Sequence, residues 1–254
     1  PSIWVQTAGG KPDARVLESR LLPPYEGSSG LGTKNAPGLR RLDGATFTGE
    51  FPLARIVFRD RKLPVKVSLE AFSPFIPHDP EDSGLPVAVL RYTVANPGPK
   101  AASVAIGFSL ENPVGPPARG KPDTRENAYS TAPGLAGIVM TNPALPQNDP
   151  LAGSLALAVL DDGKGKITYL RGWPRARWWT SPLLFWDDFT SDGELGPEAE
   201  ARGPVAALSV KREIPAGEKA AWTFLLAWSF PNRTPERCGW RAPRGDENTV
   251  IGNH

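Results

Sequence analysis

Apolar and polar side chains alternate at every second residue along most of the chain from residue 51 onward. Successive side chains of a β-strand point to opposite faces, so this period is typical of strands with one buried face. A helix with the same pattern would spread its apolar residues around every side. The clearest alternating segments are residues 65–72, 101–110 and 219–230. They predict antiparallel strands that line a core.

Short turns rich in proline and glycine separate the alternating segments. Three of them, each placed between two expected strands, are residues 96–100, 161–166 and 214–218. Proline fixes φ for a turn, and glycine takes the left-handed conformation that other residues resist. Each of these turns therefore predicts a hairpin between two antiparallel strands.

Two regions depart from this pattern. Residues 1–50 are rich in loop signals, with one expected strand at 14–21. Residues 181–193 have proline near the start and glycine at the end, which predicts one or two helical turns. No internal repeat and no long linker divides the chain. We therefore expect one all-β domain over residues 1–254, a large two-sheet antiparallel β-sandwich of about twelve to sixteen strands with long loops.

Composition fits this fold and narrows the function classes. The 26 glycines and 29 prolines are spread along the 254 residues, as many short turns require, and 40% of the residues are hydrophobic. The net charge of +2 comes without a basic stripe, so we expect no nucleic-acid partner. No apolar run approaches the ~20 residues of a membrane span, so we expect no transmembrane segment. The single cysteine, Cys238, cannot form an internal disulfide and leaves the compartment open.

The polar cluster His78, Asp79 and Asp82 is the first candidate for chemistry. Glycosidic cleavage needs two carboxyl groups about 5–10 Å apart on opposite sides of a bond, and neighbouring acidic residues in a turn do not provide that. A calcium site at this loop would lack the usual 12-residue calcium-loop pattern. Two histidines and one cysteine are too few for a structural zinc site. We expect turn and capping residues here, with no catalytic dyad, metal or other cofactor.

Tryptophan is the second candidate. Four of the eight tryptophans, Trp173, Trp178, Trp179 and Trp186, lie within fourteen residues and alternate with arginines. Such rings can fill a core, form a contact between domains, or stack on the face of a sugar. The residues by themselves leave all three roles open.

Several segments resemble, in order, the motifs of one enzyme family. Residues 76–87 read I-P-H-D-P-E-D-S-G-L-P-V, which is similar to the I-P-H-D-x-x-D-S-x-L-P-V segment of glycoside hydrolase family 116. That family includes the non-lysosomal glucosylceramidases, also called bile-acid β-glucosidases. Further similar segments are V-x-N ending at Asn96, F-S-L-E-N at 108–112, W-D-D-F with D-G-E-L at 186–195, and L-A-W-S-F-P at 226–231. Their order and spacing agree from residue 50 to residue 232.

The resemblance implies an N-terminal β-sandwich followed by a helical toroid of the (α/α)6 type. In the family, the toroid supplies the glutamate nucleophile and the aspartic acid/base of a retaining mechanism, so no catalytic position maps onto this chain. Residues 240–254 resemble the start of the linker to the toroid. Because the chain starts at Pro1 and stops at His254, we expect it to be the front portion of a longer enzyme.

The expected function is therefore a non-catalytic sandwich that supports the helical catalytic domain of the same polypeptide. We expect the contact to use the His78 loop or the 173–186 segment. The alternative is an autonomous carbohydrate-binding module that recognises sugar through exposed tryptophans.

Overall fold

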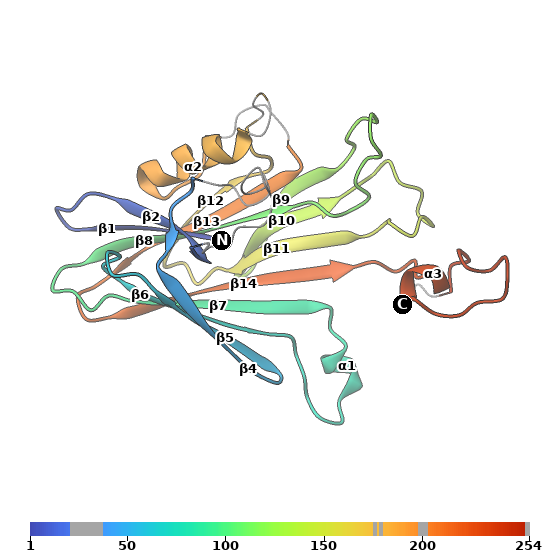
Figure 1. The fold of residues 1–254 in the computed structure, drawn as a ribbon, viewed down its shortest axis with the longest axis horizontal. Coiled ribbons are helices and arrows are strands. Elements are labelled where there is room, and N and C mark those ends of the chain that lie inside the picture. Colours follow the sequence, from blue (N-terminus) through green and yellow to red (C-terminus); the bar gives the residue numbers. More distant parts are fainter. Residues whose placement is uncertain (21–37, 175–176, 178–179, 198–202, 252–254) are drawn as a thin grey trace, which may run out of the picture.

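The strands form two sheets that pack face to face (Figure 1) in a computed structural model, which describes residues 1–251 apart from 21–37, 175–176, 178–179 and 198–202. The six-stranded sheet has the order β12-β13-β8-β1-β2-β3, and the eight-stranded sheet has the order β4-β5-β6-β7-β14-β11-β10-β9. The pairings are antiparallel except for β2 with β3. The predicted all-β, two-sheet sandwich is confirmed, with a strand number inside the expected range.

The bounds of the strands are as follows. The six-stranded sheet consists of β1 Ser2–Thr7, β2 Asp13–Ser19, β3 Arg41–Leu42, β8 Ala102–Glu111, β12 Lys166–Leu170 and β13 Val205–Ile214. The eight-stranded sheet consists of β4 Gly44–Glu50, β5 Leu53–Arg59, β6 Lys66–Phe72, β7 Val87–Ala95, β9 Glu126–Ala132, β10 Leu135–Thr141, β11 Ser154–Leu160 and β14 Lys219–Ser229.

Three short helices accompany the sheets in the described part of the chain: α1 Pro80–Ser83, α2 Ser181–Asp192 and α3 Pro235–Cys238. None of these helices is long and apolar enough to cross a membrane. The α2 helix has 12 residues, so it is longer than the one or two turns expected. Gly193 ends it with φ of 81°, a conformation that disfavours residues with a Cβ.

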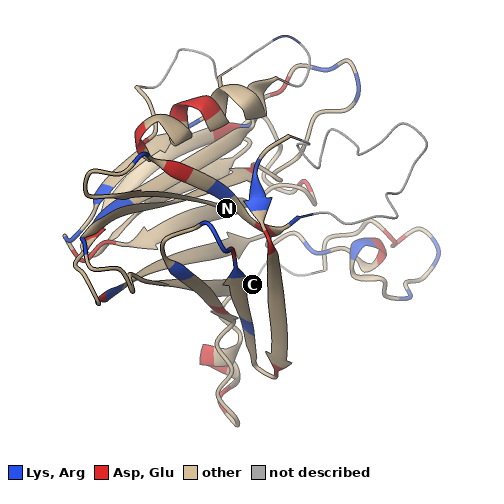
Figure 2. Ribbon diagram, turned by 60° about the vertical axis from the view of Figure 1, so that its left-hand side comes forward, with Lys and Arg blue, Asp and Glu red and all other residues tan. Residues whose placement is uncertain are grey.

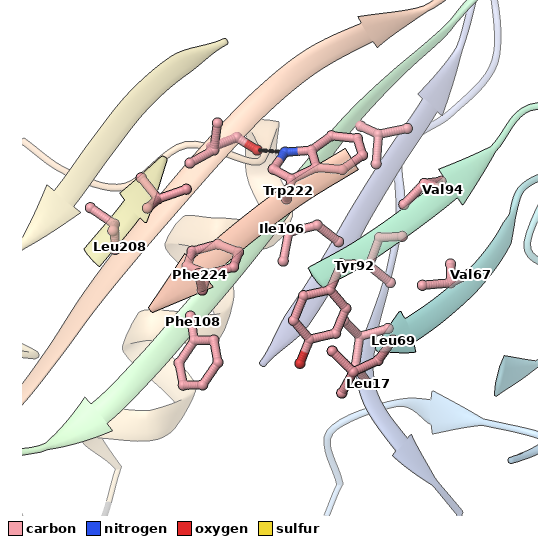
Figure 3. Packing of buried hydrophobic residues seen from close by; sticks show 14 of the residues in the cluster. Leu17, Val67, Leu69, Tyr92, Val94, Ile106, Phe108, Leu208, Trp222 and Phe224 are labelled. Carbon is pink, nitrogen blue, oxygen red and sulfur yellow. Dashed lines mark hydrogen bonds between the residues drawn. The ribbon is translucent and has the colours of Figure 1, made fainter. Parts of the chain in front are cut away.

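The main core lies between the two sheets and is built from the alternating residues (Figure 3). Tyr92, Trp222 and Phe224 of the eight-stranded sheet face Ile106 and Phe108 of the six-stranded sheet, and all five are buried. The Trp222 indole N–H donates to the Val210 carbonyl across the sandwich at 2.8 Å. This bond satisfies the polar atom of a ring that is otherwise completely enclosed.

The N-terminal region contains more strand than its sequence predicts. Besides β2, which overlaps the expected strand at 14–21, the structure has β1, β3 and β4 within residues 1–50. The β1 strand shows no alternation of apolar and polar residues, because Ile3, Trp4 and Val5 are all buried. Ile3 and Val5 face the main core, whereas Trp4 belongs to a second apolar cluster on the other side of the six-stranded sheet.

The three predicted hairpins are wrong, because each turn connects strands of two different sheets. The turns at 96–100, 161–166 and 214–218 carry the chain from one sheet to the other, because β7, β11 and β14 belong to the eight-stranded sheet while their partners β8, β12 and β13 belong to the six-stranded sheet. Proline and glycine reverse the chain equally well in both situations. What differs is the sheet that the next strand joins, which these residue types do not encode.

A buried asparagine holds two of these crossovers together. The Asn96 side-chain amide donates to the carbonyl oxygens of Lys100, Ile214 and Pro215 at 2.8, 3.1 and 3.2 Å. Its backbone carbonyl accepts from the Gly217 N–H at 2.9 Å. The β7–β8 and β13–β14 connections therefore lie side by side and share one polar group that is 1% exposed.

Candidate interdomain surface

The His78 loop joins β6 to β7 and projects, with α1, beyond the end of the eight-stranded sheet (Figure 1). Its polar residues bond mainly to the loop itself. The Asp79 carboxylate caps α1 by accepting from the Asp82 N–H at 3.0 Å. The Ser83 hydroxyl accepts from the Ile76 N–H at 2.8 Å and donates to the Ile76 carbonyl at 3.0 Å.

His78 adopts φ of 66°, a left-handed conformation that is uncommon outside glycine. The neighbouring bridge between Ile76 and Asp79 closes a tight turn around it. The sequence motif therefore builds a rigid turn, in agreement with the expected role of its residues in capping and turning. Within the described residues, no group of three histidine, cysteine or acidic side chains could hold a metal ion.

This rigid loop presents apolar side chains to solvent, together with the adjacent β4–β5 turn. Phe51 is 83% exposed, and its ring lies edge-on to Phe75 with centroids 4.8 Å apart. Leu53, Phe75, Ile76 and Leu85 are each about half exposed. We call these five residues the apolar tip. Sequence reasoning missed it, although the F-P-L run at residues 51–53 placed two large apolar residues at a turn.

The tryptophan segment lies elsewhere. Trp173 stacks on Phe185 with ring centroids 5.0 Å apart, and Trp186 is half-buried against the same cluster. This cluster fills the space between α2 and the outer face of the six-stranded sheet, so these two rings have a packing role. In Figure 1 the α2 helix and the His78 loop occupy opposite sides of the molecule. Trp178 and Trp179 lie outside the described residues.

One acidic residue of the W-D-D-F motif, Asp188, also has a local partner. The Asp188 carboxylate accepts from the Gly196 N–H at 3.0 Å and thereby ties α2 to the loop that follows it. Burial raises the pKa of Asp188 above its ordinary value, the Gly196 N–H opposes that shift, and repulsion by Asp192 adds to it. Basic and acidic residues are interspersed over the described ribbon, with several acidic residues on α2 (Figure 2).

Asn112, which ends the F-S-L-E-N motif, and Asn232, which directly follows the L-A-W-S-F-P motif, are buried as well. The Asn112 amide donates to the carbonyl oxygens of Glu126 and Thr141 at 3.1 and 3.0 Å. The Asn232 amide donates to the Asp149 carbonyl at 2.9 Å. Like Asn96 at the crossovers, each connects segments that are separated in sequence. The family motifs in the described chain therefore stabilise loops, and none of them forms a pair of carboxylates facing a cleft.

The chain was compared with solved structures. It is similar to the family 36 α-galactosidase AgaA from Geobacillus stearothermophilus, with 11% identity, 91% of this chain and 30% of that chain covered, and a TM-score of 0.37. The family 36 α-galactosidase AgaB from the same organism is 12% identical, with 91% of this chain and 30% of that chain covered and a TM-score of 0.37. A TPR-domain containing protein from Parabacteroides distasonis is 12% identical, with 81% of this chain and 37% of that chain covered and a TM-score of 0.32. The chain spans about a third or less of the length of the solved structures it matches.

A family comparison covers nearly the whole chain. Residues 1–242 match the model described as beta-glucosidase 2, glycosyl-hydrolase family 116 N-term. The motifs at residues 76–87 and 226–231 lie inside this range. The chain therefore belongs to the N-terminal domain family of glycoside hydrolase family 116.

Proposed function

We propose that this chain is the non-catalytic N-terminal β-sandwich of a β-glucosidase- or glucosylceramidase-type enzyme, and that it supports the helical catalytic domain by packing against it. The observation that carries this proposal is the apolar tip. Three of its five large side chains, Phe75, Ile76 and Leu85, belong to the His78 loop, whose polar groups bond within the loop, and Phe51 of the adjacent β4–β5 turn packs against Phe75. A rigid apolar projection loses little conformational entropy when a partner covers it.

The acidic residues support the non-catalytic part of the proposal. Asp79 caps a helix and Asp188 holds a loop N–H, so both have structural partners. Glu194 pairs with Lys166 and Lys211, which lower its pKa even though burial opposes them. A retaining glycosidase needs one carboxyl group kept protonated and a second one about 5–5.5 Å away, and these three residues serve other purposes.

The test uses the longer polypeptide in which this chain precedes the helical domain. The double variant Phe75→Ser, Ile76→Ser removes apolar surface from the tip, whereas Glu81→Gln changes an exposed position of the same loop. We expect the double variant to lower the unfolding midpoint of the longer polypeptide by several degrees and to reduce aryl β-glucoside hydrolysis. In the isolated 1–254 chain, both variants should leave the unfolding midpoint unchanged.

Two results would contradict the proposal. Hydrolysis of an aryl β-glucoside by the isolated chain would show that it is catalytic. A saturable change in tryptophan fluorescence with gluco-oligosaccharides would instead favour a carbohydrate-binding module, for which Trp228 and Trp240 are the exposed rings among the described tryptophans.

A further inference from the structure

The outer face of the eight-stranded sheet carries two continuous rows of apolar residues. The first row crosses six strands from Leu53 to Gly137, and each member lies opposite the next in the antiparallel register. It contains Leu53, Phe72, Val89, Leu225, Ala158 and Gly137. The second row pairs Val87 with Ala227, Ala227 with Ala156, and Ala156 with Val139. We call these two rows the outer apolar patch.

The other half of the same face is polar. Farther along the strands, the outward positions are occupied by Ser68, Arg91, Thr93 and Thr223. A shallow depression of about 660 Å³ nearby is lined by several basic side chains, including Arg55, Arg59 and Lys66. An antiparallel sheet with one face in water has polar residues at these outward positions. The polar half meets that expectation, and the outer apolar patch does not.

Nothing among the described helices covers the outer apolar patch. The α2 helix lies on the six-stranded sheet, and α1 and α3 lie beyond the ends of the strands (Figure 1). Leu53 is 48% exposed and Val139 is 36% exposed, and Val89 and Leu225 are half-buried, whereas Ala158 and Gly137 at the far end of the first row are buried. Contiguous apolar surface of this kind marks an interaction site.

We infer that the outer apolar patch is the face on which the helical domain of the family docks. This inference rests on the proposed function and adds the surface through which it acts. Leu53 belongs both to the patch and to the apolar tip, so the two form one continuous surface. The C-terminal half of β14 carries Leu225 and Ala227 and leads into residues 230–251. A domain attached after that segment is therefore tethered next to the patch, at high effective concentration.

The shape of the patch suits a helix. A hollow of about 120 Å³ lies between β9, β10 and β11, and Gly137, Ala156 and Ala158 are among its lining residues. Small residues line this hollow, so it can accept a large apolar side chain that projects from a helix. Side chains that fill such hollows at the centre of an interface contribute most of the binding free energy.

Binding between the 1–254 chain and a separately produced helical domain of the same polypeptide tests the inference. Leu225→Glu places a charge in the patch, and Thr223→Glu is the matched control on the same strand and the same face. We expect Leu225→Glu to weaken binding by about 30-fold or more, and Thr223→Glu to have little effect. Circular dichroism of the isolated chain checks folding, and Val139→Glu on β10 is a second variant should Leu225→Glu fail to fold.

The outcomes separate the inference from the proposed function. If the unaltered chain neither binds nor stabilises the helical domain, the proposed function fails and the inference fails with it. If Phe75→Ser in the tip weakens binding but Leu225→Glu and Val139→Glu do not, the inference fails and the proposed function stands. If the isolated chain self-associates, and Leu225→Glu abolishes self-association without affecting domain binding, the patch belongs to a second copy and the inference is overturned.

Discussion

The outer faces of the two sheets both carry apolar residues, but the described helices cover only one of them. On the six-stranded sheet, α2 buries Trp4, Ala105 and Ala207 beneath Phe185 and Phe189. On the eight-stranded sheet, the outer apolar patch has no such helix among the described elements. Docking of a partner on the outer apolar patch, as inferred above, would complete the second sheet in the way that α2 completes the first.

The covered face shows how closely a helix approaches a sheet when both belong to one core. Trp4 donates its indole N–H to the Thr190 carbonyl at 3.1 Å and so binds the helix as well as packing under it. A Cβ added at Gly107 would lie 2.8 Å from the Phe189 ring. There is no room for one further methyl group between the helix and the sheet. This region is therefore packed as densely as a protein core.

The largest expected effect is the difference in stability loss when one apolar side chain is truncated on each of the two outer faces. Phe189→Ala removes a fully buried ring on the covered face and should cost about 3–5 kcal/mol of unfolding free energy. Leu225→Ala on the bare face should cost about 1 kcal/mol or less in the isolated chain. Urea unfolding of both variants measures the two losses. An equally large loss at Leu225 would mean that the outer apolar patch is already covered within this chain.

A smaller effect is expected from adding one methyl group beneath α2. Gly107→Ala places a Cβ against the Phe189 ring, and overpacking of this kind costs about 1–3 kcal/mol. Thermal unfolding measures the loss, and the double variant Gly107→Ala, Phe189→Leu should recover part of it. An unchanged midpoint would show that α2 packs less closely on the six-stranded sheet than described above.

The smallest effect concerns pH. The pKa of Asp188 is raised in the folded protein, chiefly by burial, so its stabilising contribution is complete below the unfolded pKa and is lost as pH rises through the folded pKa. Asp188→Asn keeps an oxygen for the Gly196 N–H without the charge. It should raise the unfolding midpoint at neutral pH by at most about 2 °C, and the gain should vanish below about pH 3. The exposed Asp187→Asn is the control, and an equal gain there would point to net charge instead.

The alternation predicted β6 and β8 for different reasons. Residues 65–72 became β6, whose outward positions are polar apart from the last one. Residues 101–110 became β8, whose second face lies beneath α2 but carries only small residues, so large and small side chains still alternate. The β1 strand was missed because Trp4 faces α2 while Ile3 and Val5 face the other sheet. A strand with large apolar residues on both faces has no alternation by which the sequence could predict it.

The sheet to which each strand belongs was not predictable from the turns. The turns at 96–100 and 214–218 have the residues of hairpins, yet they connect different sheets. The distinction arises from contacts distant in sequence, of which the amide of Asn96 with Ile214 is the clearest. Local turn chemistry contains no information about such a partner 118 residues away.

The candidate surface was predictable only in part. The H-D-x-x-D-S spacing around His78 was correctly interpreted as a rigid turn held by side chains. The apolar tip was missed because Phe51 and Phe75 belong to different turns and meet only in the folded chain. The outer apolar patch was missed for a similar reason, since its rows exist only once the register of the strands is fixed.

The position of the last two strands has a consequence for synthesis. The β14 strand lies between β7 and β11, and β13 lies between β12 and β8. Until both emerge from the ribosome, β4–β7 and β9–β11 are separate pieces with open hydrogen-bonding edges, and β12 has no neighbour. Open edges of this kind pair readily with other chains. A nascent chain that stalls before residue 205 therefore carries most of its strands and neither of the two that close its sheets.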